Sequence, residues 1–463
     1  MGVRCGNLAI MILIAGAVRP AVATDLSLPG PFGAGWKSVS VTRPNSTTFT
    51  ARLFYPATTT EQNATYDGAA APYPAISFGH GFLQAVSQYQ STLQHLSTWG
   101  YFVIASDSEG SLFPNHQNFA NDMRHCLTYL EQENQSATSM LLGQVNTARF
   151  GMSGHSMGGG CSILATAADT RVKALANLAA ANTTPSAIAV MPMVTVPVSL
   201  ICGSNDTVVP VSSNGQLMYN AGGPPRQIPI ITGGFHCGFI DAGFIGCDSG
   251  AITRSAQLAI TRRLLTAFFN LYLKSDQTEW AQVWGPPALS DPQVVMTFDP
   301  GITLTPASAS GAGAAGEVVS RTFTLTNAGR QTTSYSLFAS GAHWSASVTP
   351  AATAVLNPGQ MTTLDVAVAI PFGSPNTSDT VLISARAVVD GGTRGLASLS
   401  ITKLRAGDID GDTDVDQVDT DLFIAALLGT PQSPVHVTRS DLNGDGAANG
   451  DDIVAFVASL LMP

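Results

Sequence analysis

One short segment, residues 154–158, constrains the fold of this chain more than any other. It reads Gly-His-Ser-Met-Gly, follows an apolar run at 148–152 and precedes a helix-compatible stretch at 161–168. A strand, a Gly-x-Ser-x-Gly turn and a helix in succession are typical of a nucleophile elbow, whose glycines let the backbone turn sharply enough to expose the serine hydroxyl. The sequence therefore predicts a nucleophilic serine, Ser156, in the turn at the carboxyl end of a strand.

The flanking sequence predicts an α/β domain with a mostly parallel sheet. Strand-like runs alternate with helix-like ones such as 89–99 and 118–132, and a long helical run at 252–273 follows. Such alternation places helices on both faces of the sheet. The expected strands are 73–78, 101–106, 149–153, 172–178, 197–202 and 227–231.

A nucleophilic serine needs a histidine base, and elimination leaves one. In this topology the partners follow in the order serine, acid, histidine. His236 is the candidate that fits, because it comes directly after the expected strand 227–231. The other histidines precede Ser156, adjoin it or fall in later parts of the chain: His80, His95, His116, His125, His155, His343 and His436.

The carboxylate that orients the histidine is predicted in the same way. Only Asp169 and Asp206 lie between Ser156 and His236. Asp169 falls about three helical turns beyond the serine, away from the edge where catalysis would occur. Asp206 follows the strand 197–202, so it is the predicted acid.

An anionic intermediate would need two backbone N–H donors that are already in place. Met157 follows the nucleophile and supplies the first. The second is expected from Phe82, in the Gly-His-Gly-Phe loop that follows the strand 73–78. His80 in that loop is expected to brace it and is given no proton-transfer role.

At these loops the chain resembles the secreted bacterial polyester hydrolase, cutinase and lipase family of the α/β-hydrolases. The matching segments are 154–160, 205–210 and 233–236, within a resemblance covering roughly 31–274. The resemblance implies hydrolysis of carboxylic esters without a catalytic cofactor, with aromatic polyesters among the substrates. It also implies that the substrate contacts Phe82, His155, Met157 and Val208.

The sequence departs from the family at one place that bears on the substrate. The family usually has a Trp after the strand 172–178, whereas residues 178–182 here read Leu-Ala-Ala-Ala-Asn. A lost ring-stacking contact costs about 1 kcal/mol of aromatic binding. Ester hydrolysis is therefore predicted ahead of polyester cleavage. The alternatives are a peptidase of the same fold and a non-catalytic, calcium-dependent surface-attachment protein.

The first 23 residues predict a secretory signal peptide. Arg4 precedes an apolar core at 8–18, and Ala-Val-Ala at 21–23 is a cleavage site. The protein is thus expected to be secreted, with no membrane span. Cysteine pairing is then expected, with Cys237–Cys247 favoured and Cys202–Cys237 as the competitor.

The net charge of −10 is concentrated at the C-terminal end. Eleven aspartates and two arginines give residues 404–463 a charge of −9, which leaves −1 for the other 403 residues. No basic patch indicates nucleic-acid binding.

The tail's aspartates repeat in the register of calcium-binding loops. Position 6 is Thr413 in the first loop, which weakens it, and Gly446 in the second. Oxygen ligands at this spacing wrap Ca²⁺. Duplicated loop-helix units resemble dockerin modules, which implies docking to a cohesin-type protein. The predicted ligands are Asp408, Asp410, Asp412, Asp414, Asp416 and Asp419 in the first loop, and Asp441, Asn443, Asp445, Asn449 and Asp452 in the second.

The sequence thus predicts three parts after the signal peptide. Residues 24–290 form the α/β-hydrolase catalytic domain. Residues 302–403, with short alternating strands, form an immunoglobulin-like β-sandwich that serves as a spacer or adhesion module. Residues 404–463 form a small helical, dockerin-like calcium-binding domain.

Overall fold

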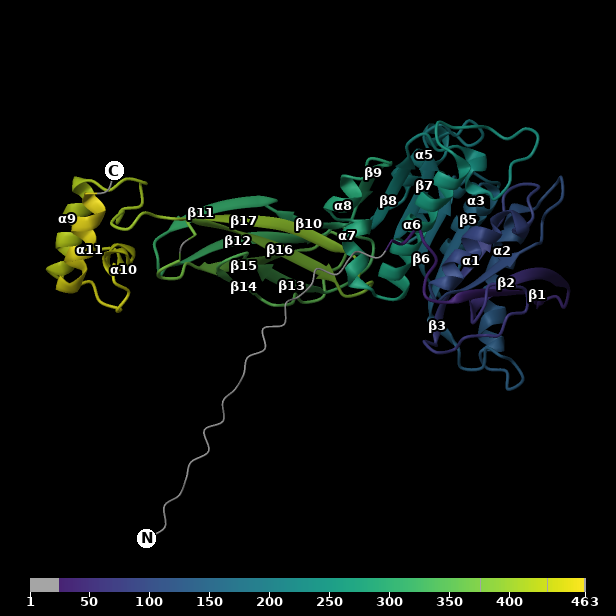
Figure 1. Ribbon diagram of the computed structural model, residues 1–463, viewed down its shortest axis with the longest axis horizontal. Helices are drawn as coiled ribbons and strands as arrows, with labels where there is room; N and C mark the ends of the chain where they lie inside the picture. The colour runs from purple at the N-terminus through teal and green to yellow at the C-terminus, as the bar shows by residue number, and fades with distance from the viewer. Residues whose placement is uncertain (1–24, 375, 431, 462–463) are drawn as a thin grey trace, which may run out of the picture.

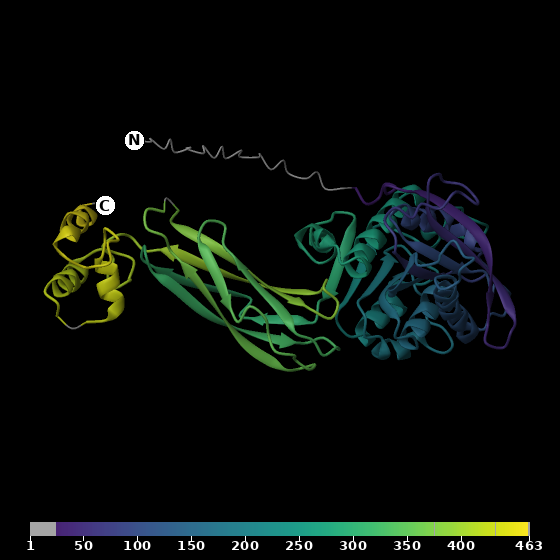
Figure 2. The ribbon, with the colours of Figure 1, turned by 90° about the horizontal axis from the view of Figure 1, so that it is seen from below.

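The computed structural model describes residues 25–374, 376–430 and 432–461. The predicted signal peptide, residues 1–23, lies outside the described residues. The chain forms three parts in a row: an α/β part at one end, a β part in the middle and a small helical part at the other end (Figures 1 and 2). Within the described ranges, no helix is long and apolar enough to cross a membrane.

The α/β part is built on a nine-stranded sheet in the order β1-β2-β4-β3-β5-β6-β7-β8-β9. The strands from β3 to β8 run parallel, and β1, β2 and β9 pair antiparallel at the two edges. The strands are β1 (Gly33–Thr42), β2 (Thr48–Ala57), β3 (Tyr73–Gly79), β4 (Phe102–Ser106), β5 (Val145–His155), β6 (Val172–Leu178), β7 (Val198–Gly203), β8 (Arg226–Ile231) and β9 (Val294–Asp299).

Helices cover both faces of this sheet, as predicted. The helices α2, α3 and α5 share one hydrophobic core with the sheet, and α1 and α6 share a second core on the other face. Every residue of β3, β4 and β7 is buried, which is typical of parallel strands covered on both sides. The helices are α1 (Gln90–Thr98), α2 (His116–Glu133), α3 (Met157–Ala167), α4 (Ala187–Val190), α5 (Gly215–Ala221), α6 (Arg254–Leu273), α7 (Trp280–Val283) and α8 (Pro286–Leu289).

The edge strand β9 lies beyond residue 290, where the sequence predicts the α/β part to end. It pairs with β8 over its whole length, from Val294 opposite Ile231 to Asp299 opposite Arg226. The stretch 290–301, expected to separate two parts of the chain, thus contains the last strand of the first sheet.

The middle part consists of two four-stranded sheets, β10-β12-β15-β14 and β11-β17-β16-β13. Both sheets contribute to one hydrophobic core, so they form a sandwich. Its immunoglobulin-like type stays a prediction. The strands are β10 (Ile302–Thr305), β11 (Ser308–Gly313), β12 (Val318–Asn327), β13 (Tyr335–Ser340), β14 (Ser345–Thr349), β15 (Met361–Ala369), β16 (Ser378–Ala387) and β17 (Arg394–Lys403).

The C-terminal part contains α9 (Gln417–Leu427), α10 (Pro434–Ser440) and α11 (Ile453–Leu460). Its small core is Ile409 with Phe423 and Phe456, whose rings stack with centroids 4.2 Å apart. Each acidic loop precedes one of the two helices that carry these rings. The core therefore joins the two loop-helix units into one body.

Polar contacts connect the three parts. Trp284 donates to the Tyr272 hydroxyl at 2.8 Å, and that hydroxyl lies 3.2 Å from the Thr393 hydroxyl of the sandwich. At the other end of the sandwich, Arg439 pairs with Glu317 at 2.8 Å, and both side chains are 12% exposed. The sandwich is thus bonded to both of its neighbours.

Candidate active site

Ser156 stands at a strained turn between β5 and α3. Its backbone has φ 54° and ψ −118°, a conformation that costs a non-glycine residue of order 1–3 kcal/mol. The neighbouring glycines are required by close backbone approach. A Cβ at Gly154 would lie 2.4 Å from the carbonyl oxygen of Gly158, and a Cβ at Gly158 would lie 2.1 Å from that of Gly79. Residues 154–158 therefore adopt the strand–turn–helix arrangement that the sequence predicts.

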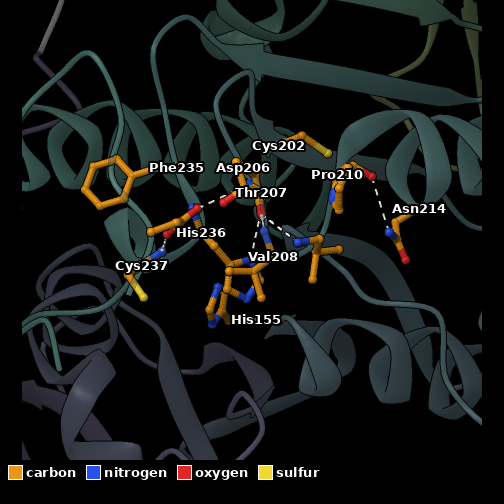
Figure 3. A network of polar contacts seen from close by, with 12 residues as sticks. His155, Cys202, Asp206, Thr207, Val208, Pro210, Asn214, Phe235, His236 and Cys237 are labelled. Carbon is orange, nitrogen blue, oxygen red and sulfur yellow. Dashed lines mark hydrogen bonds and ion pairs between the residues drawn. The ribbon is translucent and has the colours of Figure 1, made fainter. Parts of the chain in front are cut away.

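Asp206 and His236 contact each other in the way that the predicted roles require. Asp206 follows β7 and His236 follows β8, and Nδ1 of the imidazole lies 2.8 Å from Oδ2 of the carboxylate (Figure 3). The other carboxylate oxygen, Oδ1, accepts hydrogen bonds from the N–H groups of Val208 at 2.9 Å and Val209 at 2.7 Å. The carboxylate is thus oriented by its own loop and presents one oxygen to the imidazole.

Asp169, the other carboxylate between Ser156 and His236 in the sequence, bonds a different partner. It is buried beyond the C-terminal end of α3 and forms an ion pair with Arg171 at 2.6 Å. The hydrogen bonds and ion pair lower the pKa of Asp169, although burial alone would raise it. Its place supports a structural role.

Ser156 and His236 line the same cleft, which has a volume of about 240 Å³. Of the residues predicted to contact substrate, Phe82 and Val208 line it and are 45% and 53% exposed, while His155 lines it as a buried side chain. Larger cavities of about 520 and 490 Å³ lie at the two ends of the sandwich, away from Ser156.

The predicted N–H donors lie on the two segments expected for them. Met157 is the first residue of α3, where the leading amide groups have no acceptor within the helix. Phe82 lies in the loop after β3. His80 braces that loop, because its two ring nitrogens lie 2.8 Å from the carbonyl oxygen of Gly81 and 2.9 Å from that of Ser108.

A buried tyrosine that the sequence gives no reason to single out connects the Phe82 loop to the elbow. The Tyr89 hydroxyl accepts a hydrogen bond from the Gly81 N–H at 2.9 Å and lies 2.9 Å from Nδ1 of His155. Burial, with His236 nearby, holds the pKa of His155 well below its usual range, so this ring is neutral. With Nδ1 of the neutral ring as acceptor, the hydroxyl donates to it.

A disulfide joins Cys237 to Cys247 and closes the loop after His236. The favoured pairing is therefore confirmed, and the competing Cys202–Cys237 pairing is wrong. In the part of the chain that the structure describes, Cys126, Cys161 and Cys202 are buried free thiols. The loop closed by the disulfide brings a second aromatic residue, Phe244, to the cleft. The sequence signal for Phe244 is weak: it is an apolar residue in the segment between Cys237 and Cys247.

The two acidic loops of the C-terminal part have the same hydrogen-bond pattern. At position 12, one oxygen of Asp419 accepts from the N–H groups of residues 409 and 410, and one oxygen of Asp452 accepts from those of residues 442 and 443. Position 6 has positive φ in both, 90° at Thr413 and 95° at Gly446.

Carboxylate oxygens gather closely in the first loop. The oxygens of Asp408, Asp410 and Asp412 lie within 4.8 Å of one another, and so do those of Asp414, Asp416 and Asp419. A set of hard oxygen donors at this separation fits a calcium ion. In the second loop, Asp441 accepts hydrogen bonds from the N–H groups of residues 444 and 446, as Asp408 does from those of residues 411 and 413.

Comparison with known proteins follows the same division of the chain. Residues 17–237 match the family model described as PET hydrolase-like, and residues 406–461 match that of the dockerin type I domain. A cutinase, Cutinase est1 of Thermobifida alba, is 27% identical over 149 residues, which are 32% of this chain and 48% of that protein. The chain thus spans about half the length of this curated relative. These matches confirm the resemblance inferred from the three loops and the tail: residues 17–237 are similar to PET hydrolase-like proteins, and residues 406–461 to dockerin type I domains.

Proposed function

We propose that this chain is a secreted serine hydrolase that cleaves carboxylic esters through an acyl-enzyme. The observation that carries the proposal is the joint placement of the Ser156 elbow and the His236–Asp206 pair at one cleft. The match of this segment to PET hydrolase-like proteins supports an ester as the substrate.

The proposed reaction begins with attack of the Ser156 Oγ on the ester carbonyl carbon. His236 takes the hydroxyl proton, and Asp206 holds the imidazole in the tautomer that makes this transfer possible. The N–H groups of Met157 and Phe82 stabilise the tetrahedral oxyanion. His236 then protonates the leaving alcohol, and water repeats the sequence on the acyl-enzyme to release the acid.

The substitution Ser156→Ala tests this function directly. We expect it to lower the turnover of short p-nitrophenyl esters by about 10⁴-fold or more, because the acyl-enzyme can no longer form. The matched control is Ser255→Ala, since Ser255 is an exposed serine on the first turn of α6. Unchanged turnover in Ser156→Ala would refute the function. Cleavage of peptides in preference to acyl esters would instead indicate a peptidase, and an inactive wild type would indicate a surface-attachment protein.

We further propose that the cleft accepts aromatic acyl groups. Phe82 and Phe244 line it and are about half exposed, so their rings are available to a substrate. Phe244→Ala should raise KM for a p-nitrophenyl benzoate about fivefold, which corresponds to about 1 kcal/mol of ring stacking, and leave KM for the acetate unchanged. An equal effect on both esters would contradict a stacking role. Release of soluble products from a polyester film would extend the proposal to polyesters.

The remaining parts are proposed to attach the enzyme to a partner. In this proposal residues 302–403 are an immunoglobulin-like spacer, and 404–463 bind two Ca²⁺ ions and dock to a cohesin-type protein. The aspartates and asparagines of the two acidic loops would hold the ions, which neutralise the clustered charge and fix the loop conformation. Secretion by the signal peptide at 1–23 is part of the same proposal.

Calcium removal tests whether attachment and catalysis are separate. A chelator should increase proteolysis within 404–461 and leave hydrolysis of a soluble p-nitrophenyl ester unchanged. The reason is that the C-terminal part and the α/β part, whose residues line the cleft, lie at opposite ends of the sandwich (Figure 1). A parallel loss of esterase activity would contradict the separation.

A further inference from the structure

The contact between Asp206 and His236 depends on two loops that leave different strands. One loop follows β7 and carries Asp206, and the other follows β8 and carries His236. The disulfide Cys237–Cys247 closes the second loop on itself and does not reach the first. Two hydrogen bonds join the first residues of these loops: the N–H of Asn205 donates to the Gly234 carbonyl oxygen at 2.7 Å, and the N–H of Gly233 donates to the Ser204 hydroxyl at 2.8 Å. Neither bond involves the backbone of His236 or of Thr207.

One carboxylate, that of Asp248, bonds the backbone of both loops. Its Oδ2 accepts a hydrogen bond from the N–H of His236 at 2.8 Å and from the N–H of Thr207 at 3.3 Å. Its Oδ1 accepts from the N–H of Cys237 at 2.9 Å. Asp248 thus holds the backbone of the base itself and that of the residue next to the acid.

The chemistry of this arrangement calls for a carboxylate. Three N–H groups point at two oxygens, so both side-chain atoms must accept hydrogen bonds. An amide has one accepting oxygen, and its NH₂ group would face at least one N–H donor. Hydrogen bonds to an ionised oxygen are also roughly twice as strong as neutral ones.

The disulfide places this carboxylate. Asp248 follows Cys247 directly, and the Cα atoms of Cys237 and Cys247 are 5.7 Å apart. The covalent bond therefore returns the chain to His236 at the point where the Asp248 side chain can reach all three N–H groups. Since the same loop carries Phe244 and Gly246, which line the cleft, its position also shapes the cleft wall.

We propose that Asp248 is a positioning residue that holds the backbone of His236 against that of Thr207, next to the acid. This inference rests on the proposed ester hydrolase function, since it assigns a role in orienting His236 for proton transfer. Because Asp248 acts through the backbone and not on the substrate, its loss should lower kcat and leave KM nearly unchanged.

The test is the variant Asp248→Asn in the full-length protein. We expect kcat for a short p-nitrophenyl ester to fall roughly ten- to hundredfold, as small displacements of catalytic groups do, with KM within about twofold of wild type. The downfield proton resonance of the His236 Nδ1–H should broaden or disappear, because that proton reports the bond to Asp206. Thiol titration establishes that the disulfide is intact in the variant.

The matched control is Asp379→Asn. Asp379 also holds a loop by accepting hydrogen bonds from backbone N–H groups, those of residues 342, 343, 344 and 380, but it lies in the sandwich. It should leave kcat and the downfield resonance unchanged. If Asp248→Asn does not fold, Asp248→Ser, which keeps one accepting oxygen, gives the same test.

Two outcomes overturn the inference: wild-type kcat with an unchanged resonance in the Asp248 variant, or an equal loss in the Asp379 control. Either result, together with an inactive Ser156→Ala, refutes the positioning role and leaves the hydrolase function standing. An active Ser156→Ala refutes the function itself.

Discussion

The bond between Asp206 and His236 is the residue-level feature on which the proposed chemistry depends. Asp206 is buried, and each of its oxygens has a defined partner: the imidazole on one side and two backbone N–H groups on the other. The carboxylate cannot rotate without losing these bonds, so it fixes the ring orientation of His236.

Asp206→Asn should therefore lower kcat by about 10⁴-fold while the fold is retained, because the amide stabilises the wrong imidazole tautomer. Steady-state kinetics with a p-nitrophenyl ester measure the loss, and circular dichroism checks the fold. Asp169→Asn is the informative control, since it removes the other carboxylate between Ser156 and His236. A larger loss of kcat from Asp169→Asn would exchange the two assignments.

A second residue-level prediction concerns pH. Burial, with Arg262 nearby, lowers the pKa of His95 to about 4, and Nε2 of this ring lies 3.0 Å from the Leu26 carbonyl oxygen. In the unfolded chain the pKa of His95 is near 6.5. Between that pH and about 4, the unfolded chain binds a proton at His95 and the folded chain does not, so the free energy of unfolding falls as the pH falls. Between pH 7 and 4.5 the contribution of His95 to the free energy of unfolding should drop by about 2–3 kcal/mol.

Urea denaturation of the wild type and His95→Gln at the two pH values checks this. The variant should lose less stability than the wild type between pH 7 and 4.5. Parallel losses in both proteins would show that His95 does not titrate as described.

The sequence predicts the acid, base and nucleophile because chain order leaves few candidates. It does not predict Tyr89 or Asp248. Each of them bonds a residue that is far away in the sequence, Tyr89 to His155 and Asp248 to Thr207, and no local pattern marks such a contact. Phe244 reaches the cleft only through a disulfide, whose pairing the sequence leaves open between two alternatives.

At the level of elements, the buried parallel strands are the predictable ones. The expected ranges agree with β3 and β6 to within one residue at each end, because continuous apolar runs bounded by turns mark such strands. The strands β1, β2 and β9 have no such signal. They lie toward the edges of the sheet. Most residues of β1 and β9 are half-buried or exposed, and β2 is continuously buried only over its second half, so their pairing partners are needed to identify them.

The two acidic loops give an element-level prediction. Thr413 has φ 90° at the position where the second loop has Gly446. A β-branched residue with positive φ is strained, so Thr413→Gly should tighten Ca²⁺ binding by the first loop about fivefold, equivalent to about 1 kcal/mol. Gly446→Thr should weaken the second loop by a similar factor. Calorimetric titration measures both, and a weaker first loop in Thr413→Gly would contradict the strain.

At the level of the whole molecule, the sandwich is bonded to both neighbours. Arg394 donates to Gln277 at 2.6 Å on the α/β side, and Arg439 of α10 bonds both Glu317 of the sandwich and the Ile409 carbonyl oxygen of the first acidic loop. These contacts hold the three parts in the line seen in Figures 1 and 2.

Glu317→Ala should loosen the C-terminal part, because it leaves the largely buried Arg439 without its carboxylate. Small-angle X-ray scattering should then show a broader distribution of interatomic distances, and limited proteolysis should cut faster near 404–407. Asp365→Asn is the control, since Asp365 bonds Thr322 within the sandwich itself. Identical scattering curves for wild type and Glu317→Ala would show that this ion pair does not fix the C-terminal part relative to the sandwich.

The bonded sandwich has a mechanical consequence. A flexible tether would let a moored enzyme search the whole volume around its anchor, down to the anchor itself. The sandwich is bonded to both neighbours, so it instead keeps the cleft of Ser156 at a nearly constant distance from the C-terminal part. Under the proposed attachment, the cleft then cannot reach substrate close to the attachment point. Each attached molecule reaches only substrate that lies within a narrow range of distances from that point.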